Sequence, residues 1–109
     1  MSYKILPTLD FIKEFKPLKK KYPSIQEEID SQFQSLKENP FQGDPLGNDC
    51  YKIRVAVKSK GKGKSGGARL IIHVIVKNKE VYPLSIYDKS NQASISKEEI
   101  KQRIKALNQ

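Results

Sequence analysis

The chemistry that this sequence can support is set by a run of cations that no local carboxylate offsets. Residues 50–79 contain nine lysines and arginines and neither Asp nor Glu. The flanking segments are nearly neutral, because residues 1–49 carry seven cations and eight acids and residues 80–109 carry five cations and four acids. The formal net charge of +9 is therefore concentrated in the middle segment. Such a surface attracts a polyanion, most often a nucleic acid.

Five side chains in and after this segment are spaced so that they can converge on one phosphate. Lys52 and Arg54 alternate with apolar residues, so they share one face of a strand. Arg69 opens the next strand, and Tyr87 and Lys89 close the one after it. Ends of neighbouring antiparallel strands meet at one edge of a sheet, so we expect these groups to lie together. Cations held on a rigid sheet can fix a phosphate, although a solvated or structural role is the alternative for each residue.

Four further lysines and the one histidine of this segment are expected to contact RNA. The lysines around its Gly-rich loop should touch phosphates without forming a pocket, and they are Lys58, Lys60, Lys62 and Lys64. His73 is grouped with these contacts, and as the only histidine it is also a candidate for proton transfer. Its position in the middle of an apolar strand favours a structural role instead.

The sequence lacks the residues that several other catalytic mechanisms require. A single histidine and a single cysteine, Cys50, provide neither a set of zinc ligands nor an internal disulfide. The basic segment has no close pair of carboxylates for a glycosidase mechanism. Gly61, Gly63 and Gly66 match a dinucleotide-binding spacing, but a strand follows them where that motif must open a helix. We therefore expect neither a metal nor a cofactor.

The N-terminal part predicts a short strand and a helix. Residues 3–6 form the strand, and Thr8 caps the helix that follows. The apolar side chains of this helix recur at helical spacing, and they are Phe11, Phe15, Leu18 and Tyr22. Pro17 lacks a backbone donor, so the helix should kink or end near Phe15.

A second helix and a loop are predicted ahead of the basic segment. Ser24 and Glu27 have the spacing of a capping box, and Pro40 ends the helix that begins there. Its apolar face comprises Ile25, Ile29, Phe33 and Leu36. The two helices should form a hairpin whose apolar sides face a sheet. Residues 41–49 are rich in Gly and Pro and are predicted to be a loop.

Three antiparallel strands and a last helix follow. Apolar and basic residues alternate in residues 51–58, whereas residues 69–76 are apolar on both faces and should form a central strand. In the strand at residues 81–87, Pro83 predicts an irregularity or a sheet edge. A capping box of Ser96 and Glu99 starts the last helix. The predicted fold is α+β, with about four strands, an N-terminal helical hairpin, a C-terminal helix and the order β-α-α-β-β-β-α.

Length and composition predict the domain organisation and the cellular location. The 109 residues, of which 37% are hydrophobic, make one domain, residues 1–109, with a thin core. The longest apolar runs, on either side of His73, are too short to span a membrane. The N-terminus has no long apolar stretch of the kind found in secretory signals. We expect a cytoplasmic protein that does not engage a membrane.

Several of these motifs together resemble the RelE/ParE superfamily of type II toxin–antitoxin toxins, on its RelE branch. They are Tyr-Lys-Ile-Arg at residues 51–54, the basic loop, Gly-Gly-x-Arg-Leu-Ile at residues 66–71, Leu-x-Ile-Tyr-x-Lys at residues 84–89 and the final helix with its glutamates. The similarity extends over nearly the whole chain. It implies a compact, twisted antiparallel sheet with helices packed on one side, and an endoribonuclease that a cognate antitoxin silences.

The resemblance also suggests which residues act. The family's basic site positions match Lys52, Arg54, Arg69 and Lys89. The sequence departs from RelE in two places, because Ser90 stands where RelE has an arginine and no tyrosine follows Tyr87, whereas RelE has a tyrosine near its C-terminus that serves as general base. Tyr87 and His73 are both open as substitutes for that base.

The leading interpretation is a toxin that inhibits translation by cutting mRNA on the ribosome. A ribose 2′-OH would attack the adjacent phosphate without a metal, and Lys52, Arg54 and Arg69 would stabilise the charge of the transition state. A lysine crowded by other cations can act as base or acid. The alternatives are a ParE-like toxin that binds gyrase and an RNA-binding module without turnover. The expected partners are mRNA, the ribosome and a small acidic antitoxin, with which the toxin forms a hetero-oligomer.

Overall fold

The structure, a computed structural model, describes residues 2–61, 63, 66–92 and 94–107. Its elements are β1 (Lys4–Ile5), α1 (Leu9–Lys21), α2 (Ile25–Glu38), β2 (Asp44–Gly47), β3 (Cys50–Val55), the 3₁₀ turn η1 (Lys58–Lys60), β4 (Ala68–Ile75), β5 (Glu80–Asp88) and α3 (Lys97–Leu107). None of the described helices has the length and apolarity that crossing a bilayer would require.

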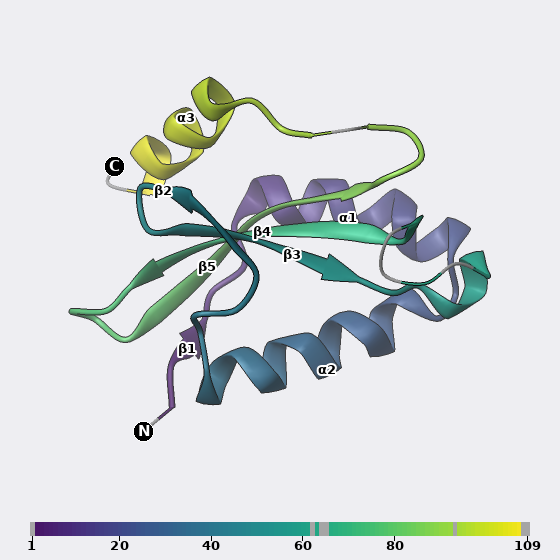
Figure 1. Ribbon diagram of the computed structural model, residues 1–109, viewed down its shortest axis with the longest axis horizontal. Helices are drawn as coiled ribbons and strands as arrows, with labels where there is room; N and C mark the ends of the chain where they lie inside the picture. Colours follow the sequence, from purple (N-terminus) through teal and green to yellow (C-terminus); the bar gives the residue numbers. More distant parts are fainter. Residues whose placement is uncertain (1, 62, 64–65, 93, 108–109) are drawn as a thin grey trace.

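The strands form one sheet in the order β1-β5-β4-β3-β2 (Figure 1). β1 runs parallel to β5, and the other neighbours are antiparallel. The predicted α+β class, the helical hairpin, the C-terminal helix and the central position of β4 are confirmed. The sheet is mixed and five-stranded, however, and the prediction of about four strands missed β2.

β2 lies in the segment that was predicted to be a loop. Its four residues, Asp-Pro-Leu-Gly, have low strand propensity, and a proline is tolerated there because β2 is at the sheet edge. Asn48 and Asp49, with φ of 54° and 59°, make the tight turn into β3. Two consecutive residues of positive φ match the right-handed twist of a hairpin, so turn geometry rather than strand propensity produces β2.

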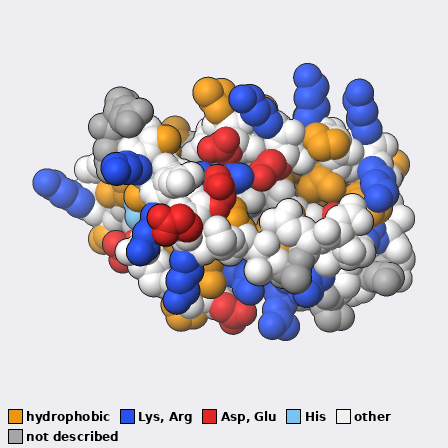
Figure 2. All heavy atoms as spheres, turned by 90° about the horizontal axis from the view of Figure 1, so that it is seen from above, with side chains coloured by type: hydrophobic (Ala, Val, Ile, Leu, Met, Phe, Trp, Pro, Cys, Tyr) orange, Lys and Arg blue, Asp and Glu red, His pale blue; other side chains and the backbone are white. Residues whose placement is uncertain are grey.

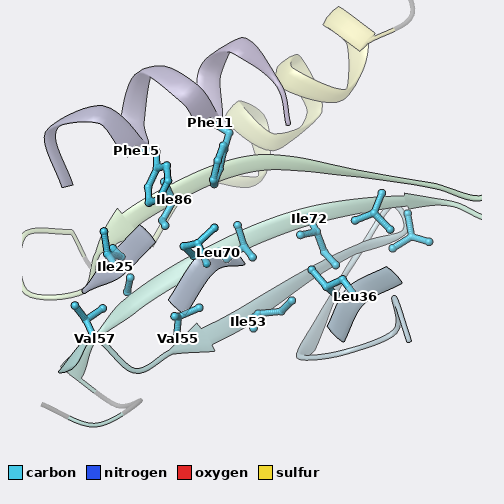
Figure 3. Packing of buried hydrophobic residues seen from close by; sticks show 14 residues of the cluster. Phe11, Phe15, Ile25, Leu36, Ile53, Val55, Val57, Leu70, Ile72 and Ile86 are labelled. Atoms are coloured by element: carbon cyan, nitrogen blue, oxygen red, sulfur yellow. The ribbon is translucent and has the colours of Figure 1, made fainter. Parts of the chain in front are cut away.

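The helices cover both faces of the sheet, whereas the resemblance implied helices on one side. α1 and α2 bury one face, with Phe11, Ile25 and Leu36 packed on Leu70 and Ile72 (Figure 3). α3 packs on the opposite face, with Ile100 in a smaller cluster that includes Ile71 and Leu84. Figure 1 shows α2 and α3 on opposite sides of the strands. Because β4 is apolar on both faces, it can serve both clusters.

Pro17 was predicted to kink or end α1 near Phe15; the helix does not end there, because it continues to Lys21. The Thr8 cap is confirmed, since its Oγ1 accepts a hydrogen bond from the Phe11 amide at 3.2 Å. Phe15 on one side of the proline is buried, and Leu18 on the other side packs against the same core. This packing outweighs the one hydrogen bond that the proline removes.

The two capping boxes differ from their predictions. Ser24 has helical φ and ψ and makes no cap bond, and its hydroxyl instead donates to Glu28 at 3.1 Å and lies 2.9 Å from the hydroxyl of Ser59. The box of Ser24 and Glu27 is therefore absent. The second box is half formed, because the Glu99 amide donates to Ser96 at 3.0 Å while the Glu99 carboxylate accepts from Arg103.

Pro83 causes an irregularity but does not mark a sheet edge. The β4–β5 register shifts between Ile71 and Ile72, opposite Ser85 and Pro83, while β5 lies between β1 and β4. Past the end of the short β1, side chains of α1 complete the hydrogen bonding of β5. The Thr8 hydroxyl donates to the Pro83 carbonyl at 2.9 Å, and Glu14 accepts from the Ile86 amide at 3.3 Å.

Candidate nucleic-acid interface

Three of the predicted site residues form a row across β3, β4 and β5. Arg54 lies directly opposite Arg69, and Arg69 lies directly opposite Tyr87. Side chains opposite each other share a sheet face, and here it is the α3 face, because Ile71, two residues from Arg69, packs in the α3-side cluster. The parity argument made from the sequence thus matches the register of the sheet. We call Arg54, Arg69 and Tyr87 the cross-strand row.

Lys52 extends the row along β3. It shares the face of Arg54, lies opposite Ile71 of β4 and Asp44 of β2, and is half-buried. Together with Tyr87 it lines a pocket of about 120 Å³ under the first turn of α3. Lys52 therefore lies between the cross-strand row and this pocket.

The two arginines of the row have different surroundings. The Arg54 side chain is exposed, and its nearest carboxylate, on Asp44, is 3.9 Å away. An exposed pair at this distance contributes little, so Arg54 can turn to an incoming anion. Arg69 is only 5% exposed, and its guanidinium donates to the Ala68 carbonyl at 3.2 Å. Arg69 is consequently the more rigidly oriented of the two.

Tyr87 is buried, and its hydroxyl has no hydrogen-bond partner within the described part of the chain. Burial raises the pKa of Tyr87, and nearby Arg69 offsets only part of this increase. A phenol with a raised pKa keeps its proton at neutral pH. The structure thus favours Tyr87 as a hydrogen-bond donor and disfavours it as the general base that the sequence left open.

Lys89 follows β5 at the end of the sheet where β4 begins with Ala68 and Arg69. Its amide donates to the Gly67 carbonyl at 3.1 Å, and its side chain is half-buried. Gly67 also lies close against β3, where a side chain would not fit, because a Cβ there would lie 2.1 Å from the Val55 carbonyl oxygen. The glycine thus holds the end of the basic loop against β3 and β5, beside the cross-strand row.

Lys60 differs most from its prediction as an RNA contact on a solvated loop. Its side chain is only 6% exposed, and its ammonium lies 2.5 Å from Asp88 and 2.7 Å from the hydroxyl of Ser90. Tyr22 donates to the other Asp88 oxygen at 2.5 Å. We call Tyr22, Lys60, Asp88 and Ser90 the Asp88 cluster. The acid that neutralises Lys60 lies outside the acid-free segment, so counting charge within that segment could not reveal it.

Electrostatics within the Asp88 cluster favour the ionised carboxylate. Burial alone would raise the pKa of Asp88, but hydrogen bonds from Lys60, Tyr22 and Ser90 outweigh it and hold the pKa well below its usual range. The same hydrogen bond to Asp88 raises the pKa of Tyr22. The cluster joins the end of α1 to η1 and to the end of β5, immediately between Tyr87 and Lys89.

Of the other predicted RNA contacts, the structure describes Lys58 and His73, and these two lie apart from each other. Lys58 is exposed, and its backbone amide donates to Glu28 at 2.7 Å. Lys62 and Lys64 lie outside the described residues. His73 lies opposite Cys50, with its Nδ1 3.5 Å from the thiol. It is four residues from Arg69 along β4, about 13 Å away, so it does not join the cross-strand row.

Cys50 and the larger grooves do not add a reactive group to the row. Burial, with a smaller effect of the Asp49 charge, raises the pKa of the Cys50 thiol to about 12, which keeps it protonated. A groove of about 570 Å³ between α2 and the end of β3 is lined by Glu27 and Glu28 as well as by cations, so it is a poor site for an anion. Among the described residues no three His, Cys, Asp or Glu side chains cluster as metal ligands would.

Sequence reasoning missed the polar network that attaches α3. Arg103 donates to Glu14 at 2.9 Å, to Glu99 at 3.1 Å and to the Leu84 carbonyl at 2.8 Å. Hydrogen bonding to Glu14 raises the pKa of Arg103 despite its burial. The four-residue spacing of Glu99 and Arg103 was the one signal in the sequence. Seen from the α3 side, acidic side chains gather near the centre of the face and basic ones project around its rim (Figure 2).

Comparison with known proteins places this geometry in a family. A family model described as "RelE toxin of RelE / RelB toxin-antitoxin system" matches residues 11–109. A structure of a mutant E. coli toxin RelE in the free state matches 97% of this chain and 98% of its own, at 20% identity and a TM-score of 0.62. A chain of the intact E. coli RelBE toxin–antitoxin complex matches 80% of this chain and 96% of its own, at 23% identity and a TM-score of 0.63. The mutant RelE in complex with an antitoxin peptide matches 94% of each chain, at 21% identity and a TM-score of 0.62.

Proposed function

This chain belongs to the RelE toxin family, and from that premise we propose that it is an endoribonuclease that cuts mRNA on the ribosome. The observation that carries the proposal is the direct opposition of Arg54 and Arg69 on neighbouring strands. Like charges placed opposite each other in a sheet repel each other. An anion such as the scissile phosphate would offset that repulsion by accepting hydrogen bonds from both guanidinium groups.

The reaction that suits the row is an internal transesterification of RNA. The ribose 2′-oxygen attacks the adjacent phosphorus, and the bond from phosphorus to the 5′-oxygen of the next nucleotide breaks. The products are a 2′,3′-cyclic phosphate and a free 5′-hydroxyl, so one proton leaves the 2′-hydroxyl and one is delivered to the leaving oxygen. Arg54 and Arg69 would hold two phosphate oxygens and stabilise the extra negative charge of the transition state.

Lys52 is the side chain best placed to exchange a proton with the reacting oxygens. It lies on the face of the cross-strand row and lines the pocket beside Tyr87. The raised pKa of Tyr87 makes the phenol a positioning donor, and the distance of His73 along β4 keeps it out of the reaction. Lys89, at the end of β5, would complete the contacts to the neighbouring phosphate.

The proposed biological partner is an acidic antitoxin. The chain has a net charge of +9, and E. coli RelE has been solved with its antitoxin and with an antitoxin peptide. An acidic segment that orders on binding would match the basic rim of the α3 side and exclude RNA. Co-expression with the neighbouring open reading frame should relieve toxicity and yield a co-purifying complex, whereas a harmless protein that no neighbour binds would contradict this part of the proposal.

The experiment that tests the activity is cleavage of mRNA on programmed ribosomes, followed by mapping of the new 5′ ends. We expect cuts in translated RNA, free 5′-hydroxyls at the cut sites, and little cleavage of the same RNA without ribosomes. Arg54→Ala should abolish the cuts, whereas Lys101→Gln, a change on the exposed side of α3, should not. Intact mRNA together with inhibited DNA supercoiling would instead support the ParE-like alternative.

A further inference from the structure

The Asp88 cluster lies on the opposite face of the sheet from the cross-strand row. Asp88 pairs with Ala68 across β4 and β5, and residues opposite each other share a sheet face. Ala68 packs in the core that α1 and α2 cover, whereas the row lies on the α3 face. The Lys60 and Asp88 side chains are also buried, at 6% and 3% exposed. An effect of this pair on RNA bound to the row must therefore pass through other residues.

Lys60 joins both ends of the basic loop to the end of β5. Its ammonium lies 2.5 Å from the Asp88 carboxylate, 2.7 Å from the Ser90 hydroxyl and 3.5 Å from the Gly67 carbonyl oxygen. The Gly67 carbonyl also accepts a hydrogen bond from the Lys89 amide at 3.1 Å. One buried cation thus connects the residue before the loop, the residue after it and the segment that follows β5.

The segment that Lys60 holds carries an anchor of Arg69. Gly67 precedes Ala68, whose carbonyl accepts a hydrogen bond from the Arg69 guanidinium at 3.2 Å. The held Gly67 carbonyl belongs to the peptide unit immediately before this anchor, and peptide units are planar and stiff. A guanidinium binds two phosphate oxygens only when its planar fork points at them. The direction of Arg69 is thereby linked to the contacts of Lys60 on the other face of the sheet.

We propose that Lys60 and Asp88 are positioning residues that hold Arg69 in the orientation from which it binds the scissile phosphate. The inference rests on the proposed function for the identity of the reaction, and it adds a part of the site that lies behind the sheet. The pair acts before RNA arrives, because its contacts are present in the free protein. Loss of the pair should release Arg69 in the unbound protein and slow turnover without removing a contact to RNA.

The first test measures the order of Arg69 in the whole free chain, so it does not depend on cleavage. NMR relaxation of the arginine Nε–H signals reports side-chain motion, and Arg69→Lys identifies the Arg69 signal by its disappearance. We expect an order parameter near about 0.85 in the wild type and below about 0.6 in Lys60→Met. Arg54, which is exposed, should be mobile in both proteins and is the internal control. Equal order of Arg69 in the two proteins would overturn the inference.

The second test separates positioning from stability by cleavage on programmed ribosomes, at a temperature at which circular dichroism shows each variant to be folded. Lys60→Met should lower kcat about 10–10²-fold and change KM less than about twofold, because a small misplacement of an oriented group slows the reaction. Leu36→Ala removes buried volume from the core and also lowers stability, yet it should keep kcat. Equal losses of kcat in the two variants, or a raised KM with unchanged kcat in Lys60→Met, would overturn the inference.

Tyr22→Phe provides a milder variant in case Lys60→Met does not fold. It removes the hydroxyl that donates to Asp88 at 2.5 Å and leaves the ion pair and the aromatic ring in place. We expect values between those of wild type and Lys60→Met for the Arg69 order parameter and for kcat, and wild-type values of both would contradict the proposal. If the wild type leaves ribosomal mRNA intact, the proposed function fails, and the Arg69 order parameter still decides whether the pair positions the arginine.

Discussion

Replacing Lys60 with methionine should lower the free energy of unfolding strongly, although Lys60 precedes a Gly-rich sequence of the kind that usually forms an exposed loop. The Lys60 and Asp88 side chains are 6% and 3% exposed and pair at 2.5 Å. Removing one partner of a buried pair costs about 3–5 kcal/mol, because the other charge remains without its counterion. Tyr22 and Ser90 still donate to Asp88 in the variant, which places the expected loss at the lower end, about 3 kcal/mol.

The measurement is the free energy of unfolding from urea titration followed by circular dichroism. For a domain of this size, a loss of about 3 kcal/mol corresponds to a fall in melting temperature of roughly 12–24 °C. Lys58→Met is the matched control, because Lys58 is exposed and only its backbone amide is used, so its effect should stay within about 0.5 kcal/mol. A loss below about 1 kcal/mol for Lys60→Met would refute the reasoning that the pair is buried and necessary.

The same cluster predicts the direction of the pH dependence. The folded pKa of Asp88 lies below its value in the unfolded chain, about 3.9, so the cluster stabilises the fold fully above that pH and loses its contribution as the pH falls further. In Lys60→Met, fewer hydrogen-bond donors oppose the effect of burial, so the pKa of Asp88 is lowered less. The loss of stability on acidification should therefore be smaller in the variant. If the free energy of unfolding fell equally on acidification in the wild type and the variant, the Lys60–Asp88 pair would not be the source of the pH dependence.

Three further outcomes are expected. Arg69→Lys should keep most RNA affinity but reduce cleavage on ribosomes about 10²–10³-fold, because an ammonium cannot hold two phosphate oxygens as the planar fork does; full activity in a folded variant would remove Arg69 from the site. RNA binding should weaken with salt at a log–log slope of about −3.5 if about five phosphates are neutralised, and a slope near zero would show that the basic segment is not the RNA surface. Gly67→Ala should lower the melting temperature strongly, because its methyl would meet the Val55 carbonyl at 2.1 Å, whereas Gly63→Ala, where no atom lies within 4 Å, should change it little.

Much of the fold could be predicted because periodicity is a local property. The apolar stripes of α1 and α2 and the alternation in β3 depend on neighbours a few residues away, and the structure places them as expected. β2 could not be found in this way, since its residues are poor strand formers and its pairing depends on the turn at Asn48 and Asp49. The continuation of α1 past Pro17 likewise depends on tertiary packing, which no helix-breaking rule contains.

The candidate site, like the fold, could be predicted only in part from the sequence. Parity predicted that Lys52 and Arg54 share one face, and the meeting of strand ends at one edge predicted that Arg69 and Tyr87 lie near them; the register places Arg69 opposite both Arg54 and Tyr87. The pocket could not be predicted, since Leu46 belongs to the unpredicted strand and Lys97 to a helix that was expected on the other face. The burial of Lys60 was equally hidden, because Asp88 is 28 residues further along the chain.

These contacts reduce the number of cations of the acid-free segment, residues 50–79, that are available to an approaching anion. Among the seven of its cations that the structure describes, Lys60 and Arg69 are turned inward, and carboxylates from outside the segment approach Lys60 and Arg54. In the proposed function, long-range attraction of RNA would depend on the exposed cations, and the inward Arg69 would orient the phosphate once it arrives. Acidic side chains gather near the centre of the α3 side and disfavour a phosphate there (Figure 2). In the proposed function, an RNA strand would therefore follow the cations of the cross-strand row and Lys89, which comes directly after β5.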